Sequence, residues 1–376
     1  MKQLLLSAFC LLMTSPMMAQ DGLTEPGVWT MSQDDGFVYL SVYDENPVYG
    51  GGTALVVLNK ETGETENLGN PLSDLVPRIT PGSDVDEAAR NITSVLKDGD
   101  DLWLGTLFGG LYVQHGDGTI DRVSTLKPIY SLTLMDETLW VGSSGAVTAF
   151  MNGEQVASEY SLQSGSSYDP VYTVAKDGEG TVWVGMADVL SDHTLCKIVE
   201  GEMMRGFPDF WSRVSRLVLR DGTLWAATMD DGLYRIGKDE YFAYKADNSD
   251  LPGNLILDML KDDGDNLWLG MQDNVVKFDG ESFESFPVTG LVRSMLLDGT
   301  TLYVGTDKGL FIFDTEMKSA TQAPLVQVPT GICGVDKTGG VPHSRYSVDG
   351  QQLKVPVKGL NIVRMSDGTV RKVVVK

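Results

Sequence analysis

The feature that most constrains this 376-residue chain is an internal repeat, built around an aromatic anchor with a small residue two positions later. Its clearest copies read ITSVLKDGDDLWLGT at 92–106, VSRLVLRDGTLWAAT at 214–228, ILDMLKDDGDNLWLGM at 256–271 and VRSMLLDGTTLYVGT at 292–306. Weaker copies cover 28–42, 129–143 and 171–186. The anchors are Tyr39, Trp103, Trp140, Trp183, Trp225, Trp268 and Tyr303. From the second copy onward their spacing is close to the ~40–45 residues of a four-stranded propeller blade.

Each copy predicts two strands joined by a polar turn. In the copy at 256–271, apolar residues at 256, 259 and 260 indicate one strand and Leu267–Leu269 the next. The Asp, Gly and Asn residues between them are typical of turns. A large aromatic beside a small residue predicts that one blade's ring packs over the backbone of the next. Because one blade cannot bury both faces, the copies must stack and close into a ring.

The sequence therefore predicts an all-β fold, a seven-bladed β-propeller followed by a small C-terminal β-domain. The step from Tyr39 to Trp103 is longer than one blade, so six or eight blades remain alternatives. We interpret this step as one blade with strands near 28–32, 37–42, 53–58 and 64–68, followed by a connecting loop over 70–91.

The N-terminus has the pattern of a secretory signal peptide. Lys2 precedes an apolar run over 4–13 that is too short to span a bilayer, and Ala19 is a small residue at the expected cleavage point. We predict a signal peptide over 1–19, the propeller over 20–320, a linker over 321–341 and a C-terminal segment over 342–376. The predicted location is secreted, cell-surface or periplasmic. No later stretch is apolar enough to predict a membrane-spanning segment.

Charge and cysteine content exclude several classes of function. A net charge of −23 argues against nucleic-acid binding, which depends on clustered Lys and Arg. Cys196 and Cys333 are the cysteines left beyond the signal peptide, and whether they pair stays open. The Asp-rich turns lack the spaced ligand set of a calcium loop. We predict neither a metal nor a cofactor.

The pattern V..L..D..G.LW.GT..GL over roughly 27–320 resembles the two-component regulator propeller repeat. The segment ADNSDLPGN at 246–254 is similar to the linker before each blade of that repeat, and Gly232–Leu233–Tyr234 is similar to its second half. Such repeats occur in the extracellular sensor regions of hybrid histidine kinases from Bacteroidetes. The resemblance implies a propeller with a recognition role outside the cell.

The tail resembles a second family, the C-terminal sorting-type domain of proteins that Bacteroidetes export through type IX-like secretion. The matching stretches are YSVDGQQL at 346–353, KGLNIV at 358–363 and KVVVK at 372–376. They predict three short strands with turns at Asp349–Gly350 and Asp367–Gly368.

Catalytic motifs do not stand out, since the sequence contains no Gly-x-Ser-x-Gly, no phosphate-binding loop and no His-Glu-x-x-His. A binding site is better supported, on the propeller face where loops between blades gather around the central channel. Aromatic residues outside the blade pattern suit sugar rings or peptide side chains. The predicted binding residues are Trp211, Phe210, Tyr168, His193, Phe108 and Tyr49.

Three functions remain open on these grounds. The first is an exported recognition protein that binds an extracellular glycan or surface protein. The second is a propeller-type polysaccharide lyase or glycoside hydrolase, for which His193, Tyr168 and Asp209 are the candidate residues. The third is a structural or assembly component that docks a partner protein.

Overall fold

The computed structural model describes most of the chain between its two ends. The described residues are 25–43, 53–73, 75, 91–124, 127–156, 159–161, 169–187, 194–207, 209–238, 240–325, 342–347, 352–353, 359–365 and 370–375. Every regular element among them is a β-strand. No described helix is long and apolar enough to cross a membrane. The predicted signal peptide lies outside the described residues.

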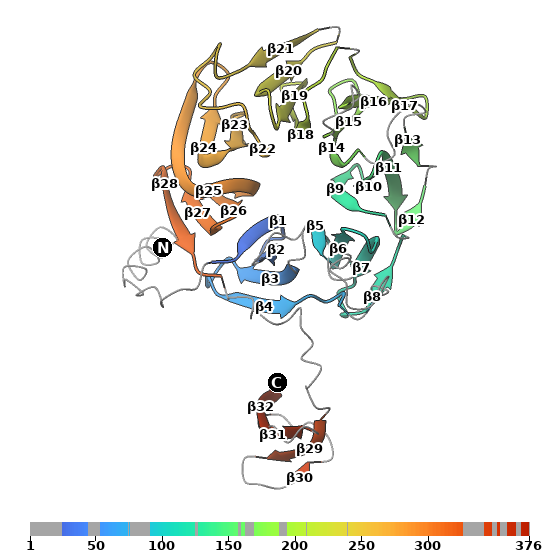
Figure 1. The fold of residues 1–376 in the computed structure, drawn as a ribbon, viewed down its shortest axis with the longest axis vertical. Coiled ribbons are helices and arrows are strands. Elements are labelled where there is room, and N and C mark those ends of the chain that lie inside the picture. Colours follow the sequence, from blue (N-terminus) through green and yellow to red (C-terminus); the bar gives the residue numbers. More distant parts are fainter. Residues whose placement is uncertain are drawn as a thin grey trace.

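The first four units of the structure are antiparallel sheets whose strands follow one another in chain order (Figure 1). The first contains β1 (Gly27–Gln33), β2 (Phe37–Tyr43), β3 (Thr53–Asn59) and β4 (Thr65–Gly69). The second contains β5 (Ile92–Asp98), β6 (Asp101–Thr106), β7 (Leu111–Gln114) and β8 (Ile120–Arg122). The third contains β9 (Ile129–Met135), β10 (Thr138–Ser143) and β11 (Ala146–Met151), with β12 (Glu154–Gln155) and β13 (Tyr160–Ser161) both paired to β11. The fourth contains β14 (Val171–Lys176), β15 (Val182–Met186), β16 (Leu195–Val199) and β17 (Glu202–Arg205).

The remaining units continue the ring, and the last two share a strand. The fifth contains β18 (Val214–Arg220), β19 (Thr223–Thr228), β20 (Leu233–Ile236) and β21 (Tyr241–Tyr244). The sixth contains β22 (Asp258–Lys261), β23 (Leu267–Gly270), β24 (Gln272–Phe278) and the first part of β25 (Phe283–Asp298). The second part of β25 is joined by β26 (Thr301–Thr306), β27 (Gly309–Asp314) and β28 (Ser319–Ala323). The predicted propeller boundary at residue 320 therefore falls inside β28.

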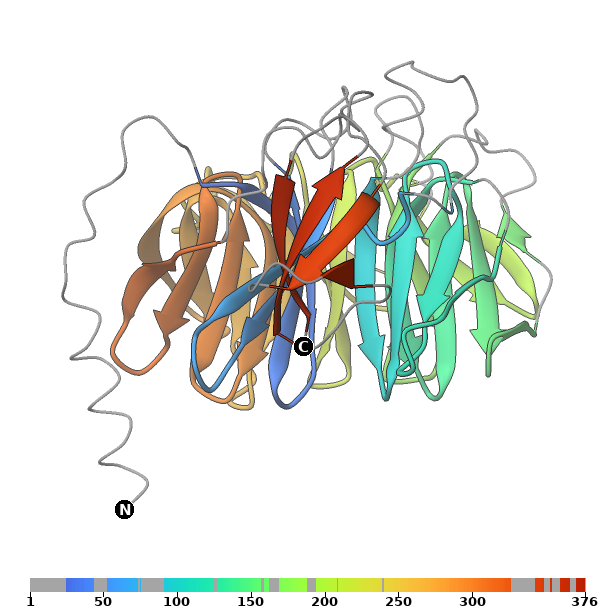
Figure 2. The same ribbon diagram turned by 90° about the horizontal axis from the view of Figure 1, so that it is seen from below.

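The first strand of each unit lies nearest the centre of the ring and the last lies at its periphery (Figure 1). Figure 2 shows that the strands run between the two faces of the ring. In the first unit the four strands begin and end within one residue of the predicted limits. Each aromatic anchor lies on the second strand of its unit.

Neighbouring units pack through the face that carries the aromatic anchor. Trp225, for example, shares a core cluster with Ile256 and Met259 of the next unit. The small residue two positions later makes room for the first aliphatic residue of the next inner strand. A Cβ added at Gly270 would lie 2.6 Å from Cγ1 of Val292. The aromatic anchor and the small residue therefore both contribute to the contact between one unit and the next.

Hydroxyl groups on the inner half of several units form hydrogen bonds to the next unit. The Ser131 hydroxyl donates to the carbonyl oxygen of Val171 at 2.9 Å, and the Ser41 hydroxyl donates to that of Ile92 at 2.8 Å. The Ser215 hydroxyl donates to the Ile256 carbonyl oxygen at 2.6 Å. These bonds are buried, where an unpaired carbonyl would be costly. They fix the spacing of successive inner strands.

The ring closes without strand exchange among the described strands. β1 to β4 all come from the N-terminal part and β25 to β28 from the C-terminal part. Their contact is a shared apolar cluster that includes Val28 and Leu310. The Gln33 amide donates to the carbonyl oxygen of Leu297 at 2.8 Å, and Lys60 pairs with Asp298 at 3.0 Å. Closure therefore depends on side-chain packing and a few polar bonds.

The longer hairpin turns between first and second strands are built around an aspartate. Oδ1 of Asp262 accepts the backbone N–H groups of Gly264 and Asn266, while its Oδ2 accepts the indole N–H of Trp268 at 2.9 Å. Asp177 repeats this with Trp183 at 2.7 Å. Burial raises the pKa of Asp262, but the hydrogen bonds from Asn266 and Trp268 outweigh it and leave that pKa lowered. The aspartates in these turns hold the hairpins and the aromatic anchors. No group of three or more His, Cys, Asp or Glu in the described chain is placed to hold a metal.

Asp262→Asn is expected to lower the free energy of unfolding by about 1 kcal/mol at pH 7, since the carboxylate accepts several bonds at a partly exposed site. A lowered folded pKa gives stability that is complete above the unfolded value of about 3.9 and is lost as pH falls through the folded value. The difference from wild type should therefore shrink at pH 3. Urea unfolding at both pH values measures it, with the exposed neighbour Asp263→Asn as control. An equal difference at both pH values would contradict the role given to the charged form.

The tail forms a separate small sheet in the order β30-β29-β31-β32. Its strands are β29 (Pro342–Ser347), β30 (Gln352–Leu353), β31 (Gly359–Met365) and β32 (Val370–Val375). The sequence predicted three strands, and the structure has four because β30 pairs with two residues of β29. The turns predicted at 349–350 and 367–368 lie outside the described residues.

Candidate functional site

The inner strands share an irregularity next to their first residues. In six units the pairing between first and second strands skips one residue, which leaves that residue outside the ladder as a β-bulge. Bulges re-aim side chains and are frequent beside binding sites. The bulged residues are Trp29, Thr93, Tyr130, Tyr172, Ser215 and Arg293.

The bulges lie at the end of the ring where loops between units meet. The start of each inner strand pairs with the end of the second strand, as Gly27 does with Tyr43. Both the connection from the previous unit and the turn from second to third strand therefore emerge at this face. Each bulged residue directly follows a buried aliphatic residue, such as Val28 or Val171. In four units the bulge thus places a large side chain at the inner rim, whereas Thr93 and Ser215 are buried and donate to carbonyl oxygens of the next unit.

Four bulged residues and two neighbours form a group that we call the axial cluster. Its members are Trp29, Tyr43, Tyr130, Tyr172, Arg213 and Arg293. The ring centroids of Tyr130 and Tyr172 are 5.7 Å apart, and those of Trp29 and Tyr43 are 5.8 Å apart at an interplanar angle of 78°. All but Tyr43 are partly exposed. Three aromatic residues and two cations thus lie where solvent reaches the rim.

The cluster includes residues from units that are not neighbours. Tyr172 belongs to the fourth unit and Arg293 to the seventh, and the charge of Arg293 acts on the Tyr172 phenol. Burial raises the pKa of the Tyr172 phenol and the adjacent Tyr130 raises it further, while the charges of Arg213 and Arg293 oppose both. Burial also raises the pKa of Tyr43, against the opposing effect of Arg293. Both phenols therefore stay protonated at neutral pH and can donate hydrogen bonds.

The two cations of the cluster differ in how they are held. Nε of Arg213 donates to Oδ2 of Asp230 at 3.0 Å, so its charge is paired. The Arg293 guanidinium lies 5.0 Å from the Trp29 ring centroid and 6.0 Å from that of Tyr43, both within cation–π range. Its Nε donates to the Tyr43 hydroxyl at 3.1 Å. Within the described residues no carboxylate forms an ion pair with Arg293.

The residues predicted from sequence for ligand binding differ in how exposed they are. Trp211 is 64% exposed and precedes Arg213 by two positions. Phe108 is 39% exposed in the turn after β6, at the same end of its unit. Phe210 is 2% exposed and packs edge-on against Tyr234 at 4.8 Å, so its ring is unavailable to a ligand in this structure. Tyr49, Tyr168 and His193 lie outside the described residues.

The other predicted residues show no catalytic arrangement in the described part. Asp209 uses its backbone carbonyl oxygen to accept the Tyr241 hydroxyl at 3.2 Å. Cys196 is buried on β16, and burial raises the pKa of its thiol to about 12. This thiol therefore stays protonated and is a poor nucleophile. Cys333 lies outside the described residues.

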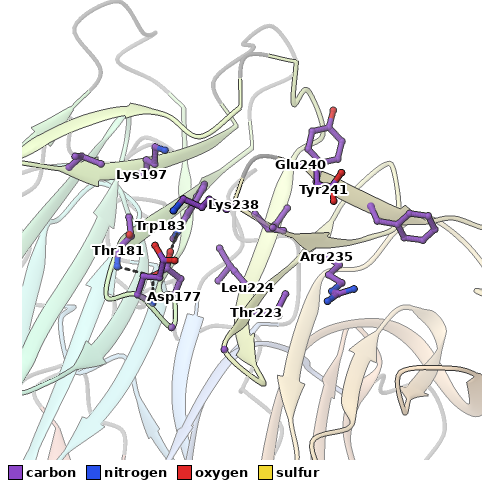
Figure 3. Close-up of a pocket in the computed structure, with 17 residues that line it drawn as sticks. Asp177, Thr181, Trp183, Lys197, Thr223, Leu224, Arg235, Lys238, Glu240 and Tyr241 are labelled. Atoms are coloured by element: carbon purple, nitrogen blue, oxygen red, sulfur yellow. Dashed lines mark hydrogen bonds between the residues drawn. The ribbon is translucent and has the colours of Figure 1, made fainter.

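A groove of about 540 Å³ also opens between the fourth and fifth units (Figure 3). Trp183 and Lys197 line one side, and Arg235, Lys238 and Glu240 line the other. Its charged groups are of both signs. The Asp177 carboxylate in its wall is already engaged by Thr181 and Trp183 in the hairpin turn. This carboxylate is therefore less available to a ligand than the Arg293 guanidinium of the axial cluster.

Sequence analysis did not single out most of the axial cluster. Trp29, Tyr130, Tyr172 and Arg293 belong to strands, whereas the search for a site followed the loops. A signal was nevertheless present in the repeat. The residue after the first aliphatic position of the inner strand is aromatic or Arg in these four copies.

Comparison with known proteins gives relatives by structure. No protein-family model matches the chain, and no curated protein matches it in sequence. The structure is similar to the extracellular domain of the putative hybrid two component system BT3049 from B. thetaiotaomicron, with a TM-score of 0.60 and 15% identity over 93% of this chain and 48% of that chain. It is also similar to PorZ, a surface component of the type-IX secretion system of Porphyromonas gingivalis, with a TM-score of 0.56 and 14% identity over 93% of this chain and 45% of that chain.

A third similar structure is YCF48 bound to D1 peptide, with a TM-score of 0.54 and 12% identity over 81% of this chain and 95% of that chain. This chain spans about half the length of the BT3049 and PorZ chains. Likeness at such low identity extends to the fold. The predicted all-β propeller is thereby confirmed, and the chain is a β-propeller protein.

Proposed function

We propose that this protein is an exported recognition propeller that binds an extracellular glycan or surface protein at the axial cluster. The observation that carries the proposal is the convergence of bulged aromatic and Arg side chains from separate units on one rim. Aromatic rings on a rigid frame offer broad contact at low entropic cost, and protonated phenols add hydrogen-bond donors. A net charge of −23 further favours an uncharged or locally charged ligand over a long polyanion.

The location and export route are part of the same proposal. The pattern over 1–19 supports export by a signal peptide, and the tail sheet over 342–375 supports a role in sorting to the cell surface. The BT3049 structure is that of an extracellular domain, and PorZ is described as a bacterial surface component. A binding module outside the cell fits all three observations.

Tyr172→Ala is expected to weaken binding of a polysaccharide ligand about tenfold, because a partly buried aromatic at the centre of a site is typical of a binding hot spot. The ligand comes from a screen of host and plant polysaccharides against the chain from residue 20 onward, by affinity electrophoresis and calorimetry. The matched control is Phe242→Ala, which removes an aromatic that is 57% exposed on the outer strand β21 and should leave affinity unchanged.

Two outcomes would contradict this proposal. Unchanged affinity in Tyr172→Ala, with the fold intact by circular dichroism, would place the ligand elsewhere. New reducing or unsaturated ends in the same mixtures would show turnover and favour the lyase or hydrolase alternative. Trp211→Ala tests whether the exposed ring beside Arg213 extends the same site.

A further inference from the structure

The Arg293 guanidinium is held in place by its neighbours, but most of its N–H donors have no hydrogen-bond acceptor among the described residues. Trp29 and Tyr43 support it through cation–π contacts at 5.0 and 6.0 Å. Nε is fixed by the Tyr43 hydroxyl at 3.1 Å, which is the one hydrogen bond of this guanidinium to a described residue. A guanidinium fixed at Nε still presents paired N–H donors that match the two oxygens of a carboxylate.

This arrangement is unusual in a chain with a net charge of −23. Two other arginines, one just before the inner strand β18 and one on it, are paired with acids. Arg213 pairs with Asp230 at 3.0 Å and Arg216 with Asp258 at 2.5 Å. The charge of Asp307 acts on Tyr43, the residue that holds Arg293. Oδ1 of Asp307, however, accepts the backbone N–H of Leu291 at 2.7 Å.

We propose that Arg293 binds the carboxylate of an acidic sugar, such as a uronic acid unit of an oligosaccharide, at the axial cluster. This inference rests on the proposed function and specifies the chemical class of its ligand. Tyr172, on which the charge of Arg293 acts, and the adjacent Tyr130 offer ring faces and phenol hydroxyls, which suit the apolar faces and hydroxyl groups of a pyranose. The bulged residues of the axial cluster are aromatic or Arg and none is aliphatic, which favours a sugar ring over an apolar peptide side chain. The overall negative charge favours one isolated carboxylate over a highly charged polymer.

The test places a reporter on the ring that holds the cation. The chain from residue 20 onward is labelled with 5-fluorotryptophan, and the Trp29 fluorine resonance is assigned by its loss in Trp29→Phe. Glucuronate and glucose serve as matched probes, since they differ in the carboxylate alone, and N-acetylglutamate amide serves as the peptide-like probe. Titration to about 50 mM detects the millimolar affinity expected of one charge-assisted contact and a stacked ring.

The expected result is a saturable shift of the Trp29 resonance with glucuronate, about tenfold weaker binding of glucose, and loss of this preference in Arg293→Gln. Arg293→Lys should retain part of the preference, and it also serves if the Gln variant fails to fold. Tyr43→Phe removes the hydroxyl that holds Nε while keeping the cation, so the preference should persist in weaker form.

Several outcomes would overturn the inference. Equal affinity for glucose and glucuronate would exclude a carboxylate contact and leave the proposed ligand site in place. Persistence of the preference in Arg293→Gln would assign the carboxylate to another group. Binding of N-acetylglutamate amide in preference to glucuronate would indicate an acidic peptide. A Trp29 resonance unmoved by every probe would reject acidic-sugar binding at Arg293, whereas the proposed function fails separately if Tyr172→Ala leaves polysaccharide affinity unchanged.

Discussion

Asp258→Ala is expected to lower the free energy of unfolding by about 3 kcal/mol, because it removes a buried carboxylate that pairs with the partly exposed Arg216 guanidinium and accepts a buried backbone N–H. The Asp258 side chain is 2% exposed. Its Oδ1 accepts Nε of Arg216 at 2.5 Å, and its Oδ2 accepts the backbone N–H of Met295 at 2.6 Å. These partners belong to β18 and β25, so one carboxylate on β22 links three successive units. The charge of Asp258 raises the pKa of Arg216, as expected for a favourable pair.

A second variant distinguishes the loss of stability in Asp258→Ala from the effect of removing any negative charge. Glu284→Gln breaks the ion pair with Lys318 at 2.6 Å, in which both side chains are about half exposed. Such surface pairs contribute about 0–1 kcal/mol, so this variant should unfold close to wild type. Asp258→Asn keeps one acceptor oxygen and should fall between wild type and Asp258→Ala. Urea unfolding followed by tryptophan fluorescence gives all three values, and a midpoint for Asp258→Ala equal to that of Glu284→Gln would refute the linking role.

Gly142→Val is expected to lower the free energy of unfolding by about 3 kcal/mol, at the upper end of the cost of overpacking. A Cβ at Gly142 would lie 2.6 Å from the carbonyl oxygen of Val171 and 2.7 Å from its Cγ1. The first of these atoms is backbone and cannot move aside without shifting β14. The same carbonyl accepts the Ser131 hydroxyl at 2.9 Å, so the tie between the third and fourth units would also be lost.

The control for this prediction is a glycine at which an added Cβ would meet no close atom. Gly36→Ala lies in a hairpin turn where the nearest atom to an added Cβ is Oδ1 of Asp34, at 3.8 Å, and it should have little effect. Ala227 occupies the corresponding position in the fifth unit and is fully buried. Gly142→Ala should therefore cost less than Gly142→Val. Thermal unfolding of the three variants, monitored by far-ultraviolet circular dichroism, tests this order, and equal stability of Gly142→Val and Gly36→Ala would exclude the close approach of the two units.

The strands of each repeat could be predicted because their signals are local. Alternating apolar residues define a strand and Asp, Gly and Asn define a turn within a few positions. The first unit shows this, since its four strands match their predicted limits within one residue. The tail was less predictable because β30 has two residues, too few for a periodic signal.

The sequence predicted that neighbouring units pack through the aromatic anchors and the small residues, but it did not predict which side chains meet there. That the small residue receives an aliphatic side chain from the next inner strand, as Gly270 receives Val292, depends on how two sheets are offset. No pattern within one repeat contains that offset. The burial of Phe210 has the same origin, since its partner Tyr234 comes from the following unit.

The sequence by itself determined the all-β propeller, because each copy of the repeat contains the residue pattern of its strands, its turn and its packing positions. It also determined that the chain is strongly acidic and lacks the common catalytic motifs. The tertiary structure decided which side chains form the axial cluster. The charge of Arg293 acts on Tyr172 only because the ring closes and because bulges in β14 and β25 re-aim these two residues. Ring closure and pairing register are properties of the assembled sheets, so no local sequence pattern encodes them.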